Sequence, residues 1–257
     1  MNTIKFILLF LISAPIFEAN AETYFGTLRG EKIIELKSPF SGVIEHNLTI
    51  DGRVNENSAP LKIKSLELES KMDILTLKIN TLNSKISRLM YEYENAQTYY
   101  NKGFISNAEL NEKKDAISEA KISLQELKIE LTALKKMLEM GTPVIANKFL
   151  IRQFYTVDKQ IVNAGDNIVS IEIIDDFYVD IKFDPVTLKG RLQDKDITVR
   201  SLVTGQTGKA TVFKISNPVD NNNTQGSKIA SLIIKADEID LSQLLDTVFE
   251  IEINDRN

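Results

Sequence analysis

Side chains that could catalyse a reaction or bind a metal are few in this sequence. The 257 residues include no cysteine and a single histidine, His46, so thiol chemistry, disulfides and cysteine-ligated metals are excluded. His46 has no second candidate ligand near it in the sequence, which argues against a metal or acid–base site there. The acidic groups of Asp175–Asp176 and Glu250/Glu252 fit the solvated sides of strands. An enzyme would require such scattered residues to converge on an acidic pocket.

A different chemistry, binding through aromatic contact, is concentrated around residue 100. Tyrosine combines a large rigid surface with a hydroxyl group and is enriched at binding hot spots. Four of the seven tyrosines lie in this region, followed by a phenylalanine: Tyr91, Tyr93, Tyr99, Tyr100 and Phe104. We expect Tyr99, Phe104 and Ser106 to contact a partner. The alternatives are that Tyr93 and Tyr100 only pack between helices and that Ser106 only caps a helix.

These residues lie where two long helical patterns meet. Apolar residues recur in alternating steps of four and three from Leu68 to Tyr100 and again from Leu110 to Leu138, which is the a/d pattern of heptad repeats. We call each such row of residues a seam. Lys113 is the one charged residue on either seam. The seams mirror each other about Phe104–Ile105, so they predict an antiparallel helical hairpin with arms of roughly 35 residues, each about 50 Å long.

The segment between the two patterns has the residues of a tight helical turn. Gly103 suits the left-handed conformation that ends a helix. Ser106 and Glu109 have the S-x-x-E spacing of a capping box, with Ile105 and Leu110 placed as its hydrophobic staple. The sequence therefore predicts that the first arm ends near Gly103 and the second begins at Ser106.

Short β segments flank the helical pattern on both sides. Those before it are 33–36, 42–44, 48–50 and 61–63, and residues 144–174 continue in the same style. The segment 49–54 (TIDGRV) also resembles 156–161 (TVDKQI). Because these two similar segments bracket the helices, we expect both β stretches to join in one module that carries the hairpin as an insertion.

A third β region follows. Apolar and polar residues alternate in five segments: 177–183, 197–200, 210–215, 229–234 and 248–253. This pattern predicts a small antiparallel barrel of about 80 residues.

The amino terminus has the pattern of an export signal. Lys5 precedes an apolar run at 6–17, and Ala19-Asn20-Ala21 fits a cleavage site. The run is shorter than the roughly 20 residues of a membrane span, so we expect cleavage after Ala21; an uncleaved anchor is the alternative. The net charge of −5 is spread along the chain, which argues against nucleic acid as a partner.

The expected fold is mixed α and β and elongated. Its parts are a signal peptide (1–21), an N-terminal extension (22–32), the first half of the β module (33–64), the helical hairpin (65–141), the second half of the β module (142–174) and an antiparallel β-barrel (175–257).

In this order, the motifs resemble those of the periplasmic adaptor proteins, or membrane fusion proteins (HlyD-like), of tripartite efflux pumps and type I secretion systems. The segments that carry the resemblance are 38–44 (SPFSGVI), 51–54 (DGRV), 103–109 (GFISNAE) and 163–168 (NAGDNI). The resemblance implies that the β module is a split lipoyl-like (barrel-sandwich hybrid) domain. It implies no cofactor, because the helical hairpin takes the place of a lysine-bearing hairpin.

The resemblance also implies a non-enzymatic coupler in the periplasm, either free there or associated with the inner membrane. Such adaptors assemble side by side as homo-oligomers. Their barrel end contacts an inner-membrane transporter of ABC or RND type, and their hairpin tips meet an outer-membrane channel of TolC-like type. The alternative is an exported coiled-coil binding or scaffold protein that is not tied to a pump.

Relatives that dock on an outer-membrane channel often carry an arginine, a leucine and a serine at the tip. Aligned on Ser106, this chain has Asn95 and Tyr99 at the other two places, so only the serine is kept. The residues expected to bind a partner at the tip are Asn95, Tyr99, Gly103, Phe104, Ile105 and Ser106.

Overall fold

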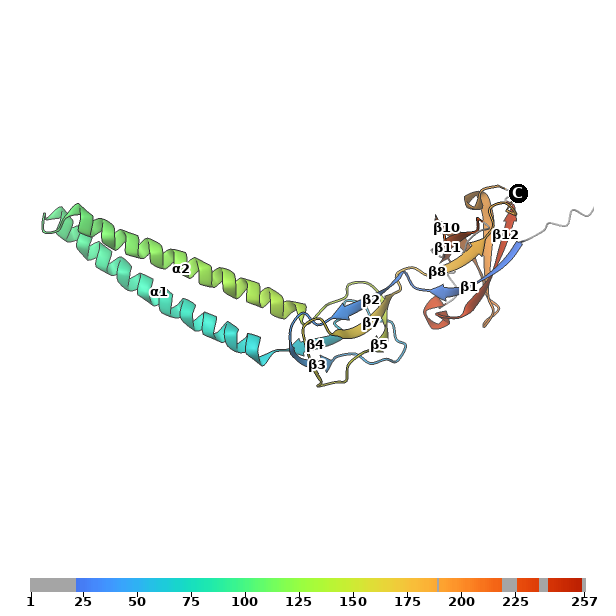
Figure 1. The fold of residues 1–257 in the computed structure, drawn as a ribbon, viewed down its shortest axis with the longest axis horizontal. Helices are drawn as coiled ribbons and strands as arrows, with labels where there is room; N and C mark the ends of the chain where they lie inside the picture. Colours follow the sequence, from blue (N-terminus) through green and yellow to red (C-terminus); the bar gives the residue numbers. More distant parts are fainter. Residues whose placement is uncertain (1–21, 189, 219–225, 236–239, 256–257) are drawn as a thin grey trace, which may run out of the picture. The chain divides into compact units, whose positions relative to one another are not determined.

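The computed structural model describes residues 22–188, 190–218, 226–235 and 240–255. The predicted signal peptide, 1–21, lies outside these residues. The chain divides into two compact units, one comprising Met1–Gly30 with Asp176–Asn257 and the other Glu31–Asp175. Figure 1 shows the elements of each unit.

The first unit is a closed antiparallel β-barrel of six strands. In chain order these are β1 (Glu22–Arg29), β8 (Tyr178–Phe183), β9 (Lys195–Ser201), β10 (Thr207–Ser216), β11 (Lys228–Lys235) and β12 (Val248–Asp255). Around the barrel they follow the order β1-β12-β9-β10-β11-β8. Among its described residues, the unit also has two short 3₁₀ helices, Leu192–Asp194 and Leu241–Leu244. Leu28, Val179, Phe249 and Ile251 are among its fully buried core residues.

Strand β1 corrects the prediction that residues 22–32 form an extension. It pairs with β12 from Glu22↔Ile253 to Thr27↔Val248, and then with β8. Burial alternates along this strand, but apolar and polar residue types do not, because the apolar Phe25 faces solvent and is 60% exposed. At Gly26, on the core-facing side, a Cβ atom would lie 2.4 Å from the Val179 Cγ1 atom, so a larger residue does not fit.

The second unit contains two long helices, α1 (Leu66–Asn101) and α2 (Asn107–Met140), which lie side by side. We call them together the hairpin. Ion pairs join its arms at Lys71–Glu130 (3.2 Å) and at Lys113–Glu92 (3.4 Å), so the helices run antiparallel. The residues buried in the hairpin all belong to the predicted seams: Leu75, Ile79, Ile86, Ala96, Leu110, Ile117, Ala120 and Leu134.

Two small sheets form the base of the hairpin. The strands before the helices are β2 (Lys32–Lys37), β3 (Gly42–His46) and β4 (Leu61–Lys64); those after are β5 (Phe149–Phe154), β6 (Ile161–Val162) and β7 (Asn167–Ile173). The sheet orders are β2-β7-β5 and β4-β3-β6, so each sheet combines strands from both sides of the helices. Leu68 and Leu138, at the base of the two helices, pack against the shared core.

The two similar segments form similar turns. Gly52 and Lys159 occupy the same place in TIDGRV and TVDKQI, and both have left-handed backbones, with φ of 72° and 63°. The expected strand at 48–50 is absent. Instead, Leu48 N–H donates to the Pro60 carbonyl (3.2 Å), and the Asp51 carboxylate accepts from the Arg53 N–H (3.0 Å), which holds a turn.

Candidate functional site

The turn between α1 and α2 is built as the sequence predicts. Gly103 has φ of 76°, and its N–H donates to the Tyr100 carbonyl at 2.9 Å. The N–H of Phe104 donates to the Tyr99 carbonyl at 3.0 Å, which satisfies a carbonyl at the helix end. The left-handed residue thus reverses the chain and leaves Phe104 at the end of the hairpin.

Ser106 caps α2 through the predicted capping box. Its hydroxyl accepts from the Glu109 N–H at 3.2 Å, and its own N–H donates to the Glu109 carboxylate at 2.8 Å. Ile105 is half-buried, and Leu110, the other residue of the predicted staple, is buried. These interactions fix the position of the turn relative to α2.

Aromatic side chains around the turn remain in solvent. Phe104 is 73% exposed and Tyr99 52% exposed. Tyr93 lies on the seam and is half-buried, with its hydroxyl donating to the Gln97 side chain at 3.2 Å. Exposed aromatic rings on a fixed backbone favour contact with another protein.

A groove of about 600 Å³ lies beside the turn, between the two arms. Its walls include the apolar residues Leu89 and Ala96 and the charged residues Glu92, Glu112 and Lys113. Lys113 is the charged residue on the seam. Its amine reaches the Glu92 carboxylate at 3.4 Å, which lets the lysine remain at a seam position with its charge paired.

Half of the six predicted tip residues line this groove. Asn95, Tyr99 and Ile105 line it. Gly103, Phe104 and Ser106 belong to the turn and do not line the groove. The charged lining was missed from the sequence, although the heptad phase places Glu92 and Tyr99 seven residues apart on one face of α1.

The side chain of His46 makes packing and hydrogen-bond contacts within the fold. Its ring stacks on Phe154 with 4.0 Å between centroids, and its Nε2 lies 3.3 Å from the Thr156 hydroxyl. Burial lowers the pKa of His46, and the nearby Asp158 opposes this shift. Within the described ranges, no group of three or more histidine, cysteine, aspartate or glutamate side chains could hold a metal.

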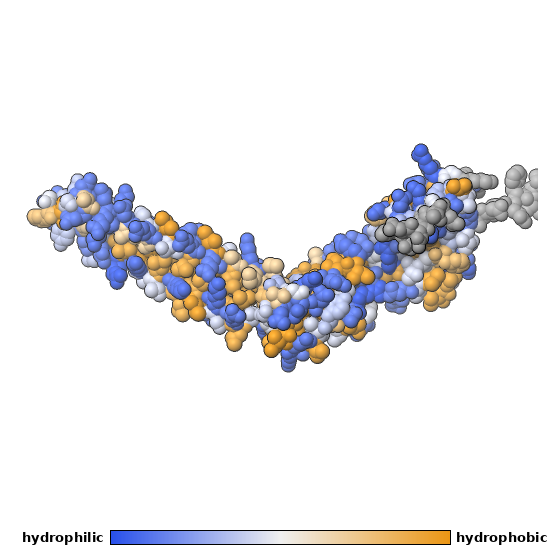
Figure 2. Space-filling model, viewed as in Figure 1, coloured by the Kyte–Doolittle hydropathy of each residue, from blue (hydrophilic) through white to orange (hydrophobic). Residues whose placement is uncertain are grey.

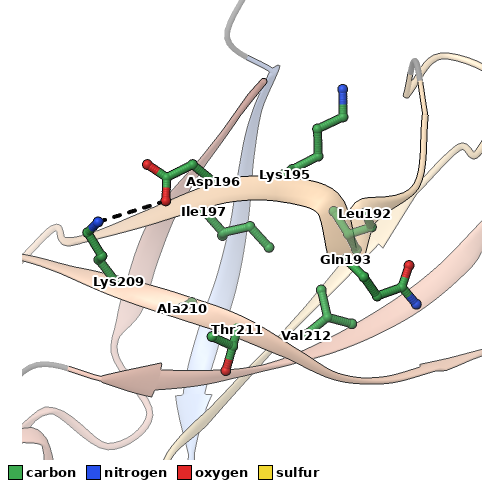
Figure 3. Close-up of a pocket in the computed structure, with 9 residues that line it drawn as sticks. All are labelled: Leu192, Gln193, Lys195, Asp196, Ile197, Lys209, Ala210, Thr211 and Val212. Atoms are coloured by element: carbon green, nitrogen blue, oxygen red, sulfur yellow. Dashed lines mark ion pairs between the residues drawn. The ribbon is translucent and has the colours of Figure 1, made fainter. Parts of the chain in front are cut away.

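The barrel has a groove of its own, of about 360 Å³, where β9 and β10 separate (Figure 3). Lys209 pairs with Asp196 at 4.0 Å, and Lys195 pairs with Asp255. The remaining lining side chains are aliphatic or neutral. This groove therefore offers paired charges but no nucleophile beside a base.

Two of the other acidic residues considered in the sequence, Asp175 and Glu250, have structural partners. Asp175 accepts from the Lys148 N–H at 2.9 Å and from the Asn147 amide, and these hydrogen bonds lower the pKa of Asp175. Glu250 pairs with Arg200 on the outside of the barrel. Of the helices in the described part of the chain, none combines the length and apolar character needed to cross a membrane.

Comparison of whole folds identifies the architecture. No family model and no curated protein matches the sequence. The structure of the membrane fusion protein Spr0693 from Streptococcus pneumoniae R6 has a TM-score of 0.72 at 15% identity, over 92% of this chain and 100% of that one. MacA from Actinobacillus actinomycetemcomitans also reaches 0.72, at 13% identity, over 91% of this chain and 78% of that one.

The chain has the fold of the membrane fusion proteins. ZneB from Cupriavidus metallidurans is a more distant match, with a TM-score of 0.58 at 9% identity, over 91% of this chain and 98% of that one. In this membrane fusion protein fold, the turn of the hairpin is the place where exposed aromatic residues, a groove and a fixed backbone coincide.

Proposed function

We propose that this chain is a periplasmic adaptor subunit that oligomerises and bridges an inner-membrane transporter to an outer-membrane channel. The observation that carries the proposal is the hairpin turn, where Phe104 and Tyr99 are exposed beside a groove at the end of two long helices. At 36 and 34 residues, the helices are each about 50 Å long, enough to hold the turn far from its base.

In this proposal, the two sheets at the base are a lipoyl-like domain split by the hairpin. The barrel contacts a transporter of ABC or RND type, and the tip contacts a TolC-like channel for efflux or secretion. The protein works by positioning and sealing, without catalysis and without a cofactor. Its place is the periplasm, reached through the leader at 1–21, which is either cleaved or kept as an anchor.

The tip residues have separate roles in this proposal. Phe104 and Tyr99 supply apolar contact area, while Ile105 and Asn95 shape the groove wall. Gly103 and Ser106 hold the turn so that the aromatic rings point away from the seam. Because Asn95 is uncharged, the partner surface opposite it need not supply a carboxylate for a bidentate ion pair.

The experiment is co-purification from crosslinked membranes with a tagged full-length chain. Tyr99→Ala and Phe104→Ala should each reduce recovery of the channel without lowering recovery of the transporter. Tyr91→Ala is the matched control, because Tyr91 is 66% exposed on the same helix but does not line the groove. Unchanged channel recovery in both tip variants would refute the tip contact.

A further inference from the structure

Both arms of the hairpin carry exposed aliphatic residues that do not belong to the seams. Ile74 and Leu77 lie on α1, Ile122 and Ile129 lie on α2, and these side chains are 52–66% exposed. Figure 2 shows apolar surface along the middle of the hairpin. A helix that packs only against one partner normally carries polar residues on its other faces.

The α1 surface is a groove with a basic edge. It has a volume of about 420 Å³ and is lined by Ile74, Leu77, Lys78, Thr81 and Lys85 of α1, and by the seam residues Leu82 of α1 and Leu127 of α2. Lys71, one heptad earlier, is paired with Glu130. Lys78 and Lys85 form no ion pair within the described residues.

The α2 surface is an apolar stripe with an acidic edge. Ile122 and Ile129 are seven residues apart and therefore lie on one side of the helix. Glu119 and Glu126 precede them by three residues each, so each carboxylate lies beside one of the isoleucines. Neither glutamate has an ion-pair partner in the part of the chain that the structure describes.

The spacing of the charges matches between the two surfaces. The two lysines are seven residues apart, and so are the two glutamates. In an antiparallel arrangement, placing Lys78 opposite Glu126 also places Lys85 opposite Glu119. The same register brings Leu77 close to Ile129, so apolar side chains meet between the charged edges.

The two surfaces also lie at the same height along the hairpin. The ion pairs Lys71–Glu130 and Lys113–Glu92 mark equal heights on the two arms. Interpolation between them puts residues 78 and 85 level with residues near 124 and 119. The matching glutamates are within about two residues of these levels, which is about 3 Å along a helix.

We propose that the α1 groove of one copy receives the α2 stripe of the next copy, with Lys78 facing Glu126 and Lys85 facing Glu119. This inference rests on the side-by-side assembly in the proposed function and names the surfaces that form it. The contact is heterologous, because two different faces meet. Because the shift along the hairpin is at most about 3 Å, neighbours are related mainly by a rotation, which allows the contacts to close into a ring.

Charge reversal tests the register. The double variant Lys78→Glu/Lys85→Glu and the double variant Glu119→Lys/Glu126→Lys should each associate at least about tenfold more weakly, because like charges then face each other at two places. Analytical ultracentrifugation measures the association, and circular dichroism shows that the helices are intact. Lys121→Glu/Lys128→Glu is the matched control, with the same charge change on the other side of the stripe, and should assemble normally.

Mixing the two reversed variants gives the sharper result. Each variant repels itself, but each of its faces complements the other variant. The mixture should therefore assemble as alternating copies, and native mass spectrometry should find only even copy numbers. Normal assembly of both reversed variants alone, or a mixture that stays dissociated, would overturn the proposed register.

Cysteine crosslinking separates this inference from the proposed function. The chain has no cysteine of its own, so a mixture of Leu77→Cys and Ile129→Cys chains can form a disulfide only between introduced residues. We expect a Leu77→Cys/Ile129→Cys heterodimer and no heterodimer when Lys121→Cys replaces Ile129→Cys. A wild-type chain that remains monomeric would refute side-by-side assembly itself, whereas an assembled chain lacking this crosslink would refute only the surfaces named here.

Discussion

Replacement of Gly141 by a larger residue is expected to destabilise the protein because the site has no room for a side chain, and not because of the backbone conformation. It follows the last residue of α2 and has an ordinary φ of −72°. A Cβ atom there would lie 2.5 Å from the Phe40 Cζ atom and 3.1 Å from the Ile63 carbonyl oxygen. Phe40 is buried, and Ile63 N–H donates to the Gly141 carbonyl at 2.8 Å, so neither neighbour can move freely.

The sign of the stability change on Gly141→Ala distinguishes overpacking at this site from a simple effect of helix propensity. Gly141→Ala should destabilise the protein by about 1–3 kcal/mol, the usual range for overpacking. If the site had room for a methyl group, the same change would stabilise by about 0.4–1 kcal/mol through the unfolded chain. Urea unfolding followed by circular dichroism at 222 nm measures the difference.

A second variant tests whether contact with the Phe40 ring causes this destabilisation. Phe40→Leu removes the ring atom that the new methyl group would meet, so Gly141→Ala should cost less in that background. A coupling of about 1 kcal/mol or more between positions 40 and 141 is expected for residues in contact. Equal or greater stability of Gly141→Ala in the wild-type background would refute the close contact at the base of the hairpin.

Three further predictions concern the turns and the histidine. Lys159→Gly should stabilise the protein by about 1 kcal/mol in urea unfolding, because a lysine with φ of 63° is strained, whereas Gly52→Ala should destabilise it. Ser106→Ala should lower the unfolding free energy by about 1 kcal/mol through loss of the cap, and a Ser106→Asp control should retain it. Burial lowers the folded-state pKa of His46, so the unfolding free energy should fall as pH decreases from about 6.5 towards that lower pKa. His46→Gln should remove this pH dependence. A His46→Gln variant with the same pH profile as the wild type would contradict the prediction.

The helices and most strands could be predicted because their signals are local and periodic. Every buried residue of the hairpin lies on a seam that the four-and-three spacing identifies, such as Ile79 and Ile117. The capping box at Ser106 is likewise a short motif with one structural meaning.

Two features were predicted wrongly: one strand was missed, and one was expected where the chain forms a turn. Strand β1 joins the barrel through pairing with β12, more than 200 residues away, and Gly26 and Phe25 break its alternation. Residues 48–50 have strand-like composition, but the Asp51 turn and the Leu48–Pro60 hydrogen bond use the backbone differently. At the tip, the sequence predicts the aromatic residues, whereas the charged groove wall depends on how the two arms pack.

The most direct test of the adaptor role is site-specific photocrosslinking in cells from the end of the hairpin. A photoreactive residue replacing Phe104 should capture an outer-membrane channel protein, identified by mass spectrometry, and the same residue replacing Tyr91 should not. Capture of no channel from position 104, or equal capture from both positions, would contradict the claim that the hairpin turn docks on a channel.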